Sequence, residues 1–350
     1  MKVLHIIWSL LNGGTENMLC DIINYQVKSE KVTLLVVNDM IDDSLISRLD
    51  KRCKVITLLR PRGTKNPCYI LKMNAIVLFN HYDIVHLHNT NMINYLFVKA
   101  NYVRTVHCNS ISEHKYRWHK AIIAISHSVK DMLKQNGYDS VLINNGVNAN
   151  LIVPKNNFSK SSVFSILQVG RVVFSEKGQD ILLKAIANLV GRGINNIHLD
   201  YIGTGCDFQL LSEQIKAMNL SDYVTLKGNQ PREYIYKHIC DYNLYVQPSR
   251  IEGFGLTVAE AMAAKVPVLI SDNPGPMQVI ANGKYGYYFE SDSVDGCANA
   301  IEHILDNYPT KEFIDSAYHY VLSYFSIEST ARKYVALYED ILVSVQKRIW

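Results

Sequence analysis

The feature that most constrains the fold is a regular alternation, along the whole chain, of short β-rich runs with longer helical patterns. Strands that are separated by helices imply parallel sheets built from right-handed crossovers. The runs are apolar throughout, as expected where helices cover both faces of a sheet. A first series of strands is predicted at Val3–Trp8, Val32–Val37, Val55–Leu59, Ile84–Leu87, Val103–His107, Ala121–Ile125 and Val141–Ile143, and a second at Phe164–Val169, Ile197–Ile202, Val224–Leu226, Tyr242–Val246 and Val266–Ile270.

The helical patterns and the length predict two domains. Helices are expected at Asn17–Val27, Ser128–Asn136, Gln179–Val190, Phe208–Met218 and Thr257–Ala264. A chain of 350 residues exceeds what one core usually fills, and the polar stretch Asn148–Ser162 separates the two series. We therefore expect an α/β fold with two Rossmann-like domains, residues 1–160 and 161–326. A ligand would bind in the cleft between them, at the carboxyl ends of the strands.

Composition narrows the class of protein and its compartment. The chain has no run of 18 apolar residues that would span a membrane, and Met1–Trp8 predicts a first strand instead of a signal peptide. Its seven cysteines are odd in number and scattered, without a Cys-x-x-Cys pair. That pattern favours a reducing, cytoplasmic environment over a disulfide framework or a zinc site.

The net charge of +4 is unevenly distributed. Residues 1–165 carry 20 Lys and Arg against 11 Asp and Glu, whereas residues 166–350 carry 16 against 21. A basic first half suggests an anionic partner, such as a phosphorylated acceptor or a lipid surface at the inner face of a membrane. The alternative is that these cations only line solvated faces. No nucleic-acid-binding motif accompanies the charge, so nucleic acid is the poorer interpretation.

Two carboxylates, Glu252 and Glu260, flank a Gly-x-Gly turn in Pro248–Ala263. Gly253 and Gly255 lack Cβ, so the backbone can turn sharply and approach a ligand. The start of the following helix favours an anion such as phosphate. Hydroxyl-binding carboxylates beside a phosphate-binding helix start suit a nucleotide-sugar site. The alternative is a capping box running from Thr257 to Glu260, with Glu252 as a solvated loop acid.

This stretch resembles the signature of retaining glycosyltransferases of family 4, which fold as two facing Rossmann-like domains in the GT-B architecture. The resemblance implies that Glu252 holds hydroxyls of the donor sugar and that Glu260 holds the nucleotide ribose. It also places the Gly253, Phe254, Gly255 and Leu256 positions at the donor. A final helix within 327–350, periodic from Ile327, would return to pack on the first domain.

Arg171 and Lys177 follow the first strand of the second domain. They match the family motif whose Arg and Lys hold the donor diphosphate, where fixed cations stabilise the charge that develops on the leaving group. No Asp-x-Asp pair occurs in the chain to hold a divalent ion. The sequence therefore predicts metal-independent chemistry without a cofactor.

Two glycine turns are further candidates for donor binding. Gly13 and Gly14 follow the first strand and precede a helix, which matches the family's first loop, and Gly203 follows the strand Ile197–Ile202. Neither turn has the spacing of the dinucleotide fingerprint, so NAD is not expected. Pro274–Met277 stands where many relatives carry a glycine-rich turn and a Glu, which puts a donor contact there in doubt.

The first domain offers fewer candidates. His107 ends a predicted strand and matches a family histidine that contacts the donor sugar. His86 and His88 lack Cys, Asp or Glu at ligand spacing, so a metal is not expected. Ser126 is expected to cap a helix, and Lys130 would add a cation near the phosphates. The basic, aromatic segment 113–120 and the cations of 51–65 suit either a membrane interface or a solvated loop.

Together these features predict a retaining, metal-independent glycosyltransferase. It would move a sugar from a UDP- or GDP-sugar to a hydroxyl of a glycan or lipid-linked acceptor, in bacterial surface polysaccharide synthesis. Two alternatives remain: a nucleotide-sugar epimerase of the same architecture, and a non-catalytic partner subunit that binds nucleotide sugar.

Overall fold

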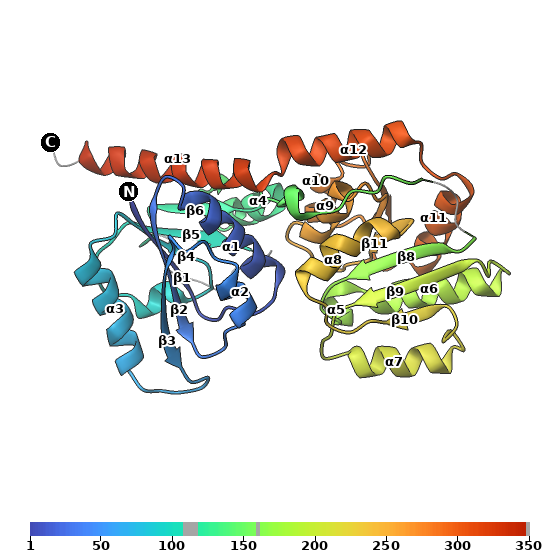
Figure 1. Ribbon diagram of the computed structural model, residues 1–350, viewed down its shortest axis with the longest axis horizontal. Coiled ribbons are helices and arrows are strands. Elements are labelled where there is room, and N and C mark those ends of the chain that lie inside the picture. The colour runs from blue at the N-terminus through green and yellow to red at the C-terminus, as the bar shows by residue number, and fades with distance from the viewer. Residues whose placement is uncertain (108–117, 159–161, 348–350) are drawn as a thin grey trace. The chain divides into compact units, whose positions relative to one another are not determined.

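The computed structural model describes residues 1–107, 118–158 and 162–347, in which the chain forms two compact α/β units (Figure 1). Unit 1 comprises Met1–Gly146 and Ile327–Trp350, and unit 2 comprises Val147–Ser326. Each unit is built on one parallel sheet, so the expected pair of Rossmann-like domains is confirmed. Among the described residues, none of the helices combines the length and the apolar character needed to cross a bilayer.

The first boundary, at Gly146, lies earlier than the predicted one at residue 160. The chain beyond it already bonds to unit 2: the backbone N–H of Lys155 donates to the carbonyl of Ala264 at 2.9 Å, and its Nζ donates to the carbonyl of Tyr242 at 2.6 Å. The expected linker is therefore, over its described part, a segment of unit 2.

Unit 1 has a seven-stranded sheet of order β3-β2-β1-β4-β5-β6-β7. The strands are β1 (Lys2–Ile7), β2 (Lys31–Asn38), β3 (Lys54–Arg60), β4 (Ile84–Leu87), β5 (Tyr102–Val106), β6 (Ala121–Ala124) and β7 (Val141–Leu142). The helices are α1 (Gly14–Gln26), α2 (Asp43–Ser47), α3 (Cys68–Asn80), the 3-10 turn η1 (Met92–Tyr95), α4 (His127–Gln135) and α13 (Ile327–Gln346). The terminal helix α13 packs on α1 within this unit.

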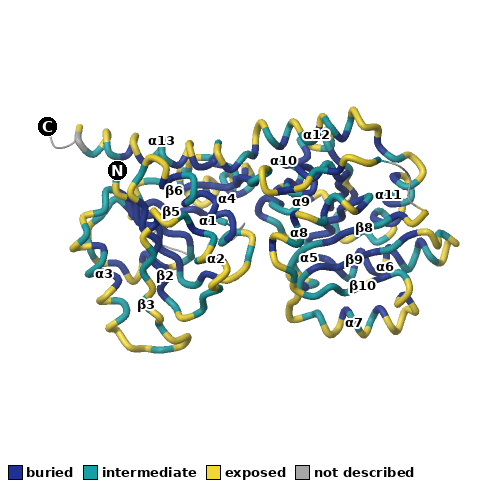
Figure 2. The backbone as a smooth tube through the Cα atoms, viewed as in Figure 1, coloured by how far each residue is buried: buried dark blue, intermediate teal, exposed yellow. Residues whose placement is uncertain are grey.

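The alternation of side chains along β2 builds two cores in unit 1. Leu35 and Val37 join a cluster with residues of α3 and η1, whereas Leu34 and Val36 join a cluster with residues of α1 and α2. Successive strand residues point to opposite faces, so both faces of this sheet are covered by helices. The central strands β1, β4 and β5 are buried almost throughout, whereas the edge strand β3 is partly exposed (Figure 2).

Unit 2 has a six-stranded sheet of order β10-β9-β8-β11-β12-β13. The strands are β8 (Phe164–Val169), β9 (Ile197–Ile202), β10 (Val224–Leu226), β11 (Leu244–Gln247), β12 (Val268–Ser271) and β13 (Tyr287–Phe289). The helices are η3 (Ala149–Leu151), α5 (Phe174–Lys177), α6 (Gln179–Gly191), α7 (Phe208–Ala217), α8 (Arg232–His238), η4 (Ile239–Asp241), α9 (Leu256–Ala263), α10 (Pro274–Val279), α11 (Val294–Asp306) and α12 (Lys311–Tyr324).

A network of buried histidines crosses the sheet of unit 1 toward α1. His5 on β1 is fully buried, and its two ring nitrogens lie 2.9 Å from Nε2 of His88 and 2.8 Å from Oε1 of Gln26 on α1. Burial lowers the pKa of His5 to about 4, although the bond to Gln26 opposes this shift. The ring is therefore neutral at pH 7.

The same network continues to α13 through His86. Its Nδ1 lies 2.5 Å from the hydroxyl of Tyr338 on α13, and its Nε2 lies 2.7 Å from Oγ1 of Thr105 on β5. The His86 and His88 rings stack with centroids 4.3 Å apart, and burial holds the pKa of both well below the usual value. The terminal helix is thus attached to the centre of the sheet by polar as well as apolar contacts.

These lowered pKa values predict an acid-sensitive unit 1. The unfolded chain takes up protons on His5, His86 and His88 below about pH 6.5. In the folded unit the pKa of His5 is about 4, and burial holds the pKa values of His86 and His88 well below the usual value. Each histidine should therefore remove up to about 1.4 kcal/mol of unfolding free energy per pH unit as the pH falls through that window. Denaturant unfolding between pH 7.5 and pH 5 measures the slope.

The matched variants are His88→Gln, which should flatten this dependence, and His303→Ala, whose side chain is exposed and which should leave it unchanged. A wild-type stability that stays constant from pH 7.5 to pH 5 would show that the buried rings take up protons in the folded unit as readily as they do in the unfolded chain.

Candidate functional site

The loops after β8 and β9 touch each other through backbone. Gly203 has φ +133°, and a Cβ there would collide with the carbonyl oxygen of Gly170. The Gly203 N–H donates to the carbonyl of Gly228 at 2.7 Å. This close approach accounts for the glycine in the loop after β9, a predicted donor-binding position, and it fixes where Arg171 leaves the end of β8.

A second close approach lies between α5 and the loop after β11. Gly178 follows Lys177 with φ +64°, and a Cβ there would collide with the carbonyl oxygen of Pro248. The backbone N–H groups of Arg250 and Ile251 both donate to the carbonyl of Glu176, at 2.9 and 3.0 Å. The end of α5 and the loop that carries Glu252 are therefore held together by backbone contacts.

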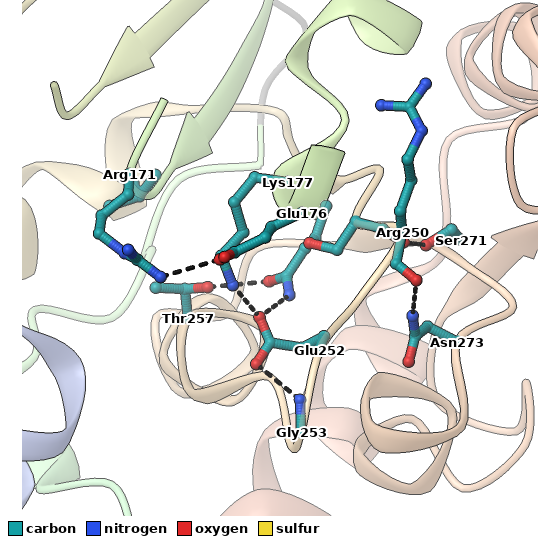
Figure 3. A network of polar contacts seen from close by, with 12 residues as sticks. Arg171, Glu176, Lys177, Arg250, Glu252, Gly253, Thr257, Ser271 and Asn273 are labelled. Carbon is teal, nitrogen blue, oxygen red and sulfur yellow. Dashed lines mark hydrogen bonds and ion pairs between the residues drawn. The ribbon is translucent and has the colours of Figure 1, made fainter. Parts of the chain in front are cut away.

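Lys177 and Glu252 form an ion pair at this junction (Figure 3). Nζ of Lys177 lies 2.8 Å from Oε2 of Glu252, and each side chain is 20% exposed. The same oxygen accepts a bond of 3.0 Å from Nε2 of Gln247, and Oε1 accepts one of 3.1 Å from the Gly253 N–H. The hydroxyl of Thr257 donates to Gln247 at 2.9 Å and so orients its amide. Sequence reasoning placed both charged residues at the donor but did not foresee their direct contact.

Arg171 lies beside this pair and is more accessible. Its Nη2 donates to Oε2 of Glu176 at 2.9 Å, and the two side chains are 70% and 40% exposed. Figure 3 shows the Arg171 guanidinium directed toward the same group of residues as Lys177. The structure thus brings Arg171, Lys177 and Glu252 together. Glu176 is an added acid that sequence reasoning did not assign.

Glu260 lies on α9 and contacts α8. Its Oε1 accepts a bond of 2.6 Å from the hydroxyl of Tyr236, which in turn accepts one of 2.6 Å from Arg232. Gly255 is the N-cap of α9 and forms no side-chain cap, while Thr257 bonds to Gln247. The alternative capping box is therefore wrong, because Thr257 is inside the helix and its hydroxyl has another partner.

The remaining predicted donor-binding positions are glycines, which offer only backbone groups, and apolar residues that are buried or half-buried. Phe254 is 1% exposed and packs edge-on against Phe325, with centroids 5.3 Å apart. Its ring belongs to the core, so the prediction that it binds the donor is wrong for the side chain. Gly253 and Gly255 are also buried, and Leu256 is half-buried. Gly275 on α10 packs closely against this turn, so that a Cβ on Gly275 would lie 2.6 Å from the carbonyl oxygen of Glu252.

Arg250 was missed by sequence reasoning, since it stood among surface-type loop residues. Its guanidinium bonds twice to Asp180 on α6, at 2.7 and 3.1 Å, and once to the Phe174 carbonyl at 2.5 Å. The bonds to Asp180 and Asp292 raise the pKa of Arg250. The backbone carbonyl of Arg250 also accepts a bond of 2.7 Å from Asn273 (Figure 3). Arg250 thus fastens the loop of Glu252 to three neighbouring segments.

In unit 1, Gly13 and Gly14 lie where the first loop meets α1, as predicted. Gly13 is the N-cap, with no side-chain cap, and a Cβ there would lie 2.5 Å from Oε2 of Glu16. The carboxylate of Glu16 therefore lies over the helix start that was expected to favour a phosphate. An incoming anion would have to displace it.

His107 follows β5 and is half-buried. Burial, together with the charge of Arg104, lowers the pKa of His107 to about 3, and neither ring nitrogen has a hydrogen-bond partner in the part of the chain that the structure describes. The ring stacks on His88, with centroids 6.2 Å apart. His107 is therefore a neutral ring whose two nitrogens are buried without a hydrogen-bond partner among the described residues.

Ser126 caps α4, as predicted, because its hydroxyl accepts a bond of 3.2 Å from the Val129 N–H. Lys130 follows one turn later in α4 and is half-buried. In the basic, aromatic segment 113–120, residues 113–117 lie outside the described residues, and Trp118 is 62% exposed.

Within the described residues, three histidines are close enough together to hold a metal ion: His5, His86 and His88. The nitrogens of His5 and His86 already bond to His88, Gln26, Tyr338 and Thr105. The cluster fits a hydrogen-bond network that attaches helices to the sheet.

Two parallel-sheet units, with cations and carboxylates gathered at the strand ends of unit 2, are typical of GT-B glycosyltransferases. A profile of the family "Glycosyl transferases group 1" matches residues 140–319, which is more than half of the chain, and one of "Glycosyltransferase Family 4" matches residues 12–151. The chain belongs to this family of glycosyltransferases, which transfer a sugar from a nucleotide sugar.

Relatives agree with this assignment. The 2-deoxystreptamine N-acetyl-D-glucosaminyltransferase of Niallia circulans is 22% identical over 65% of this chain and 68% of its own length. The capsular polysaccharide biosynthesis glycosyltransferase CapM of Staphylococcus aureus is 28% identical over 55% of this chain, which spans 54% of CapM. The structure of Anabaena Alr3699/HepE in complex with UDP-glucose has a TM-score of 0.80 at 21% identity, with 97% of this chain and 100% of that one covered. The similarity to the Alr3699/HepE structure shows that the two chains share a fold.

The Arg250 contacts predict a structural role for this side chain. Arg250→Ala removes four hydrogen bonds of a cation that is 26% exposed, so unit 2 should lose about 1–3 kcal/mol of unfolding free energy. Arg192→Ala, which removes a more exposed pair with Glu302, is the control and should cost less than about 1 kcal/mol. Urea unfolding compares the two. Equal losses would mean that Arg250 does not fasten the loop.

Proposed function

We propose that the chain is a retaining glycosyltransferase that uses a UDP- or GDP-sugar and needs no metal ion. The observation that carries this proposal is the ion pair of Lys177 and Glu252, whose two side chains remain 20% exposed. A pair that served stability alone would gain little from such exposure. Partly exposed charges at the strand ends are instead accessible to a polar ligand.

In the proposed complex, Glu252 accepts hydrogen bonds from hydroxyls of the donor sugar, and Lys177 donates to the diphosphate. Lys177 moves partly from the carboxylate to the phosphate as negative charge develops there. Such an interaction is stronger in the transition state than in the ground state, and this difference accelerates the reaction. Arg171, which forms an ion pair with the neighbouring Glu176, would contribute a second cation to the diphosphate.

The proposed chemistry needs no nucleophile from the protein. The bond between the sugar's anomeric carbon and the phosphate oxygen breaks, and the acceptor hydroxyl oxygen bonds to the same face of that carbon. The acceptor's proton passes to the leaving phosphate oxygen. His107 is proposed to bond a sugar hydroxyl and not to supply a proton, because its pKa is lowered to about 3 and its ring is neutral.

Glu260 is proposed to hold the ribose of the nucleotide. Tyr236 keeps one carboxylate oxygen in place through a bond of 2.6 Å, and Arg232 lies 4.4 Å from the centre of the Tyr236 ring. The N-terminus of α9 has no acid in its first turn and no side-chain cap. The first backbone N–H groups of α9 can therefore donate to a phosphate oxygen without competition from a side-chain cap.

A glycan or lipid-linked acceptor in surface polysaccharide synthesis, at the inner face of the cytoplasmic membrane, is part of the proposal. It is supported by the similarity to CapM, a capsular polysaccharide glycosyltransferase, and by the basic first half of the chain. An epimerase of the same architecture would convert the donor without any acceptor. A non-catalytic subunit would bind the donor and turn nothing over.

Two substitutions test the catalytic pair. Glu252→Gln and Lys177→Met should each lower kcat for sugar transfer about 10²–10³-fold, since each removes a charged contact to the reacting groups. Radiolabelled transfer from the preferred nucleotide sugar measures this loss. Glu213→Gln and Lys216→Met, on exposed positions of α7, are the matched controls and should keep the wild-type rate.

Near-normal transfer by either site variant would refute the assignment of these two residues. Conversion of the donor sugar to its epimer by the wild-type protein, without acceptor, would favour the epimerase instead. Tight donor binding with no transfer to any hydroxyl acceptor would favour the non-catalytic subunit.

Donor identity and metal independence are tested together by thermal shift with UDP-, GDP-, ADP- and dTDP-sugars. A ligand at 100 times its Kd should stabilise the protein by about 2.7 kcal/mol, and EDTA should not reduce the shift. Loss of the shift in EDTA, restored by Mg²⁺, would contradict metal-independent binding. A shift with EDTA that disappears in Lys177→Met would support a role for this cation on the diphosphate.

A further inference from the structure

One segment of unit 1 carries positive charge alone. Residues 51–82 contain seven Lys and Arg and neither Asp nor Glu. These cations are Lys51, Arg52, Lys54, Arg60, Arg62, Lys65 and Lys72. The segment includes β3, which is the edge strand of the sheet, and α3. All of the cations except the half-buried Arg60 are exposed, so the segment presents a positive field to its surroundings.

Helix α3 is apolar on its inner and on its outer side. Met73 and Val77 are buried against the sheet, as a surface helix requires. The outer side nevertheless exposes Leu71 by 56%, Leu78 by 50% and Phe79 by 74%. Figure 2 marks exposed positions along this helix. We call the outer residues, namely Leu71, Lys72, Ala75, Leu78 and Phe79, the docking face.

The end of η1 and the residues after it extend this apolar surface. Asn74 on α3 donates to the carbonyl of Tyr95 at 2.8 Å and accepts a bond of 2.9 Å from the Phe97 N–H. Tyr95 is 46% and Phe97 67% exposed. Large apolar side chains scattered singly over a surface are ordinary, but several on adjoining segments indicate a partner.

The charges decide which partner fits. A second copy of the chain, meeting this face about a two-fold axis, would bring the same cations of both copies together and leave them unneutralised. Nucleic acid would satisfy the cations but would offer no apolar layer to Phe79 and Leu78. An anionic bilayer offers phosphates at its surface and hydrocarbon just below them, so it satisfies both sets of residues.

We propose that the docking face of α3 inserts into the interfacial layer of an anionic membrane, with Arg62, Lys65 and Lys72 bound to lipid phosphates. α3 has 13 residues, which is too short to span a bilayer, so it would lie along the surface. This inference deepens the proposed function and rests on it for the lipid-linked acceptor, whose reacting hydroxyl would be presented at that surface.

The test is co-sedimentation of the full chain with vesicles of phosphatidylglycerol mixed with phosphatidylcholine, and with vesicles of phosphatidylcholine alone. We expect binding to the anionic vesicles at low salt and weaker binding at high salt, since salt screens exposed charges. Phosphatidylcholine vesicles should bind much more weakly, because they lack the net negative charge that attracts the cations.

Two pairs of substitutions separate the contributions. Arg62→Gln with Lys65→Gln should weaken binding about 25-fold, or about fivefold for each cation. Leu78→Ser with Phe79→Ser should weaken it at least about tenfold. The matched control is Leu210→Ser on α7 with Met218→Ser at the C-cap of this helix, two exposed apolar positions, and it should bind as the wild type does. Since all four of these positions are exposed, circular dichroism should show an unchanged fold.

Three results would overturn the inference. The first is a failure of the wild-type protein to bind anionic vesicles at low salt, which would contradict membrane binding directly. Binding lost with the cations but unchanged in the Leu78 and Phe79 variant would indicate a polyanion instead of a membrane. A dimer in sedimentation analysis that the same variant dissociates would assign the face to a second copy.

Failure of this inference is distinguishable from failure of the proposed function. The docking-face variants should keep the nucleotide-sugar thermal shift and transfer to a soluble acceptor, whereas Glu252→Gln should lose transfer and still sediment with vesicles. Loss of vesicle binding in Glu252→Gln would show that sedimentation reports on general damage to the protein.

Discussion

In a parallel sheet the carboxyl ends of all strands lie at the same edge. At this edge of unit 2, the loops pack directly against one another through their backbone atoms. Gly178 lies against Pro248, Gly203 against Gly170, and Gly275 against the loop of Glu252, each with no room for a Cβ. Because these contacts leave the loops little freedom, they determine where side chains can emerge. The pairing of Lys177 with Glu252 at 2.8 Å follows from them. The polar groups of the candidate site are therefore positioned by the backbone that surrounds them.

The two units place their polar groups in opposite ways. In unit 1, His5, His86 and His88 are almost completely buried, neutral and bonded to one another or to helix side chains. In unit 2, the charged side chains of Lys177 and Glu252 are partly open to water. A buried group without charge strengthens a core when all its bonds are made, whereas a charged group must remain accessible if a ligand is to replace its partner. Burial thus separates structural polar residues from candidate functional ones.

Sequence reasoning identified the architecture because its signals are local. The predicted strands Ile84–Leu87, Phe164–Val169 and Ile197–Ile202 agree with β4, β8 and β9 at both ends. Helix α3 was not among the named helices because its apolar residues occupy both sides, which removes the periodic pattern. Glu252 could be found from its glycines, but the contacts of Tyr236 with Glu260 and of Arg250 with Asp180 join residues 24 and 70 positions apart. No local pattern encodes such contacts, and only the fold reveals them.

Unit 1 is assembled from two segments, Met1–Gly146 and Ile327–Trp350, with the whole of unit 2 between them in the chain, and this affects the order in which the units can fold during synthesis. Its sheet and first helices leave the ribosome early, but Tyr338, the hydroxyl partner of His86, is made only after the whole of unit 2. Until then the imidazoles of the sheet have water in place of α13, and the side of α1 that this helix covers stays exposed. All of unit 2 is translated during that interval. The second unit can therefore be complete while the first still waits for its final helix, so translation itself sets the sequence in which the two cores close.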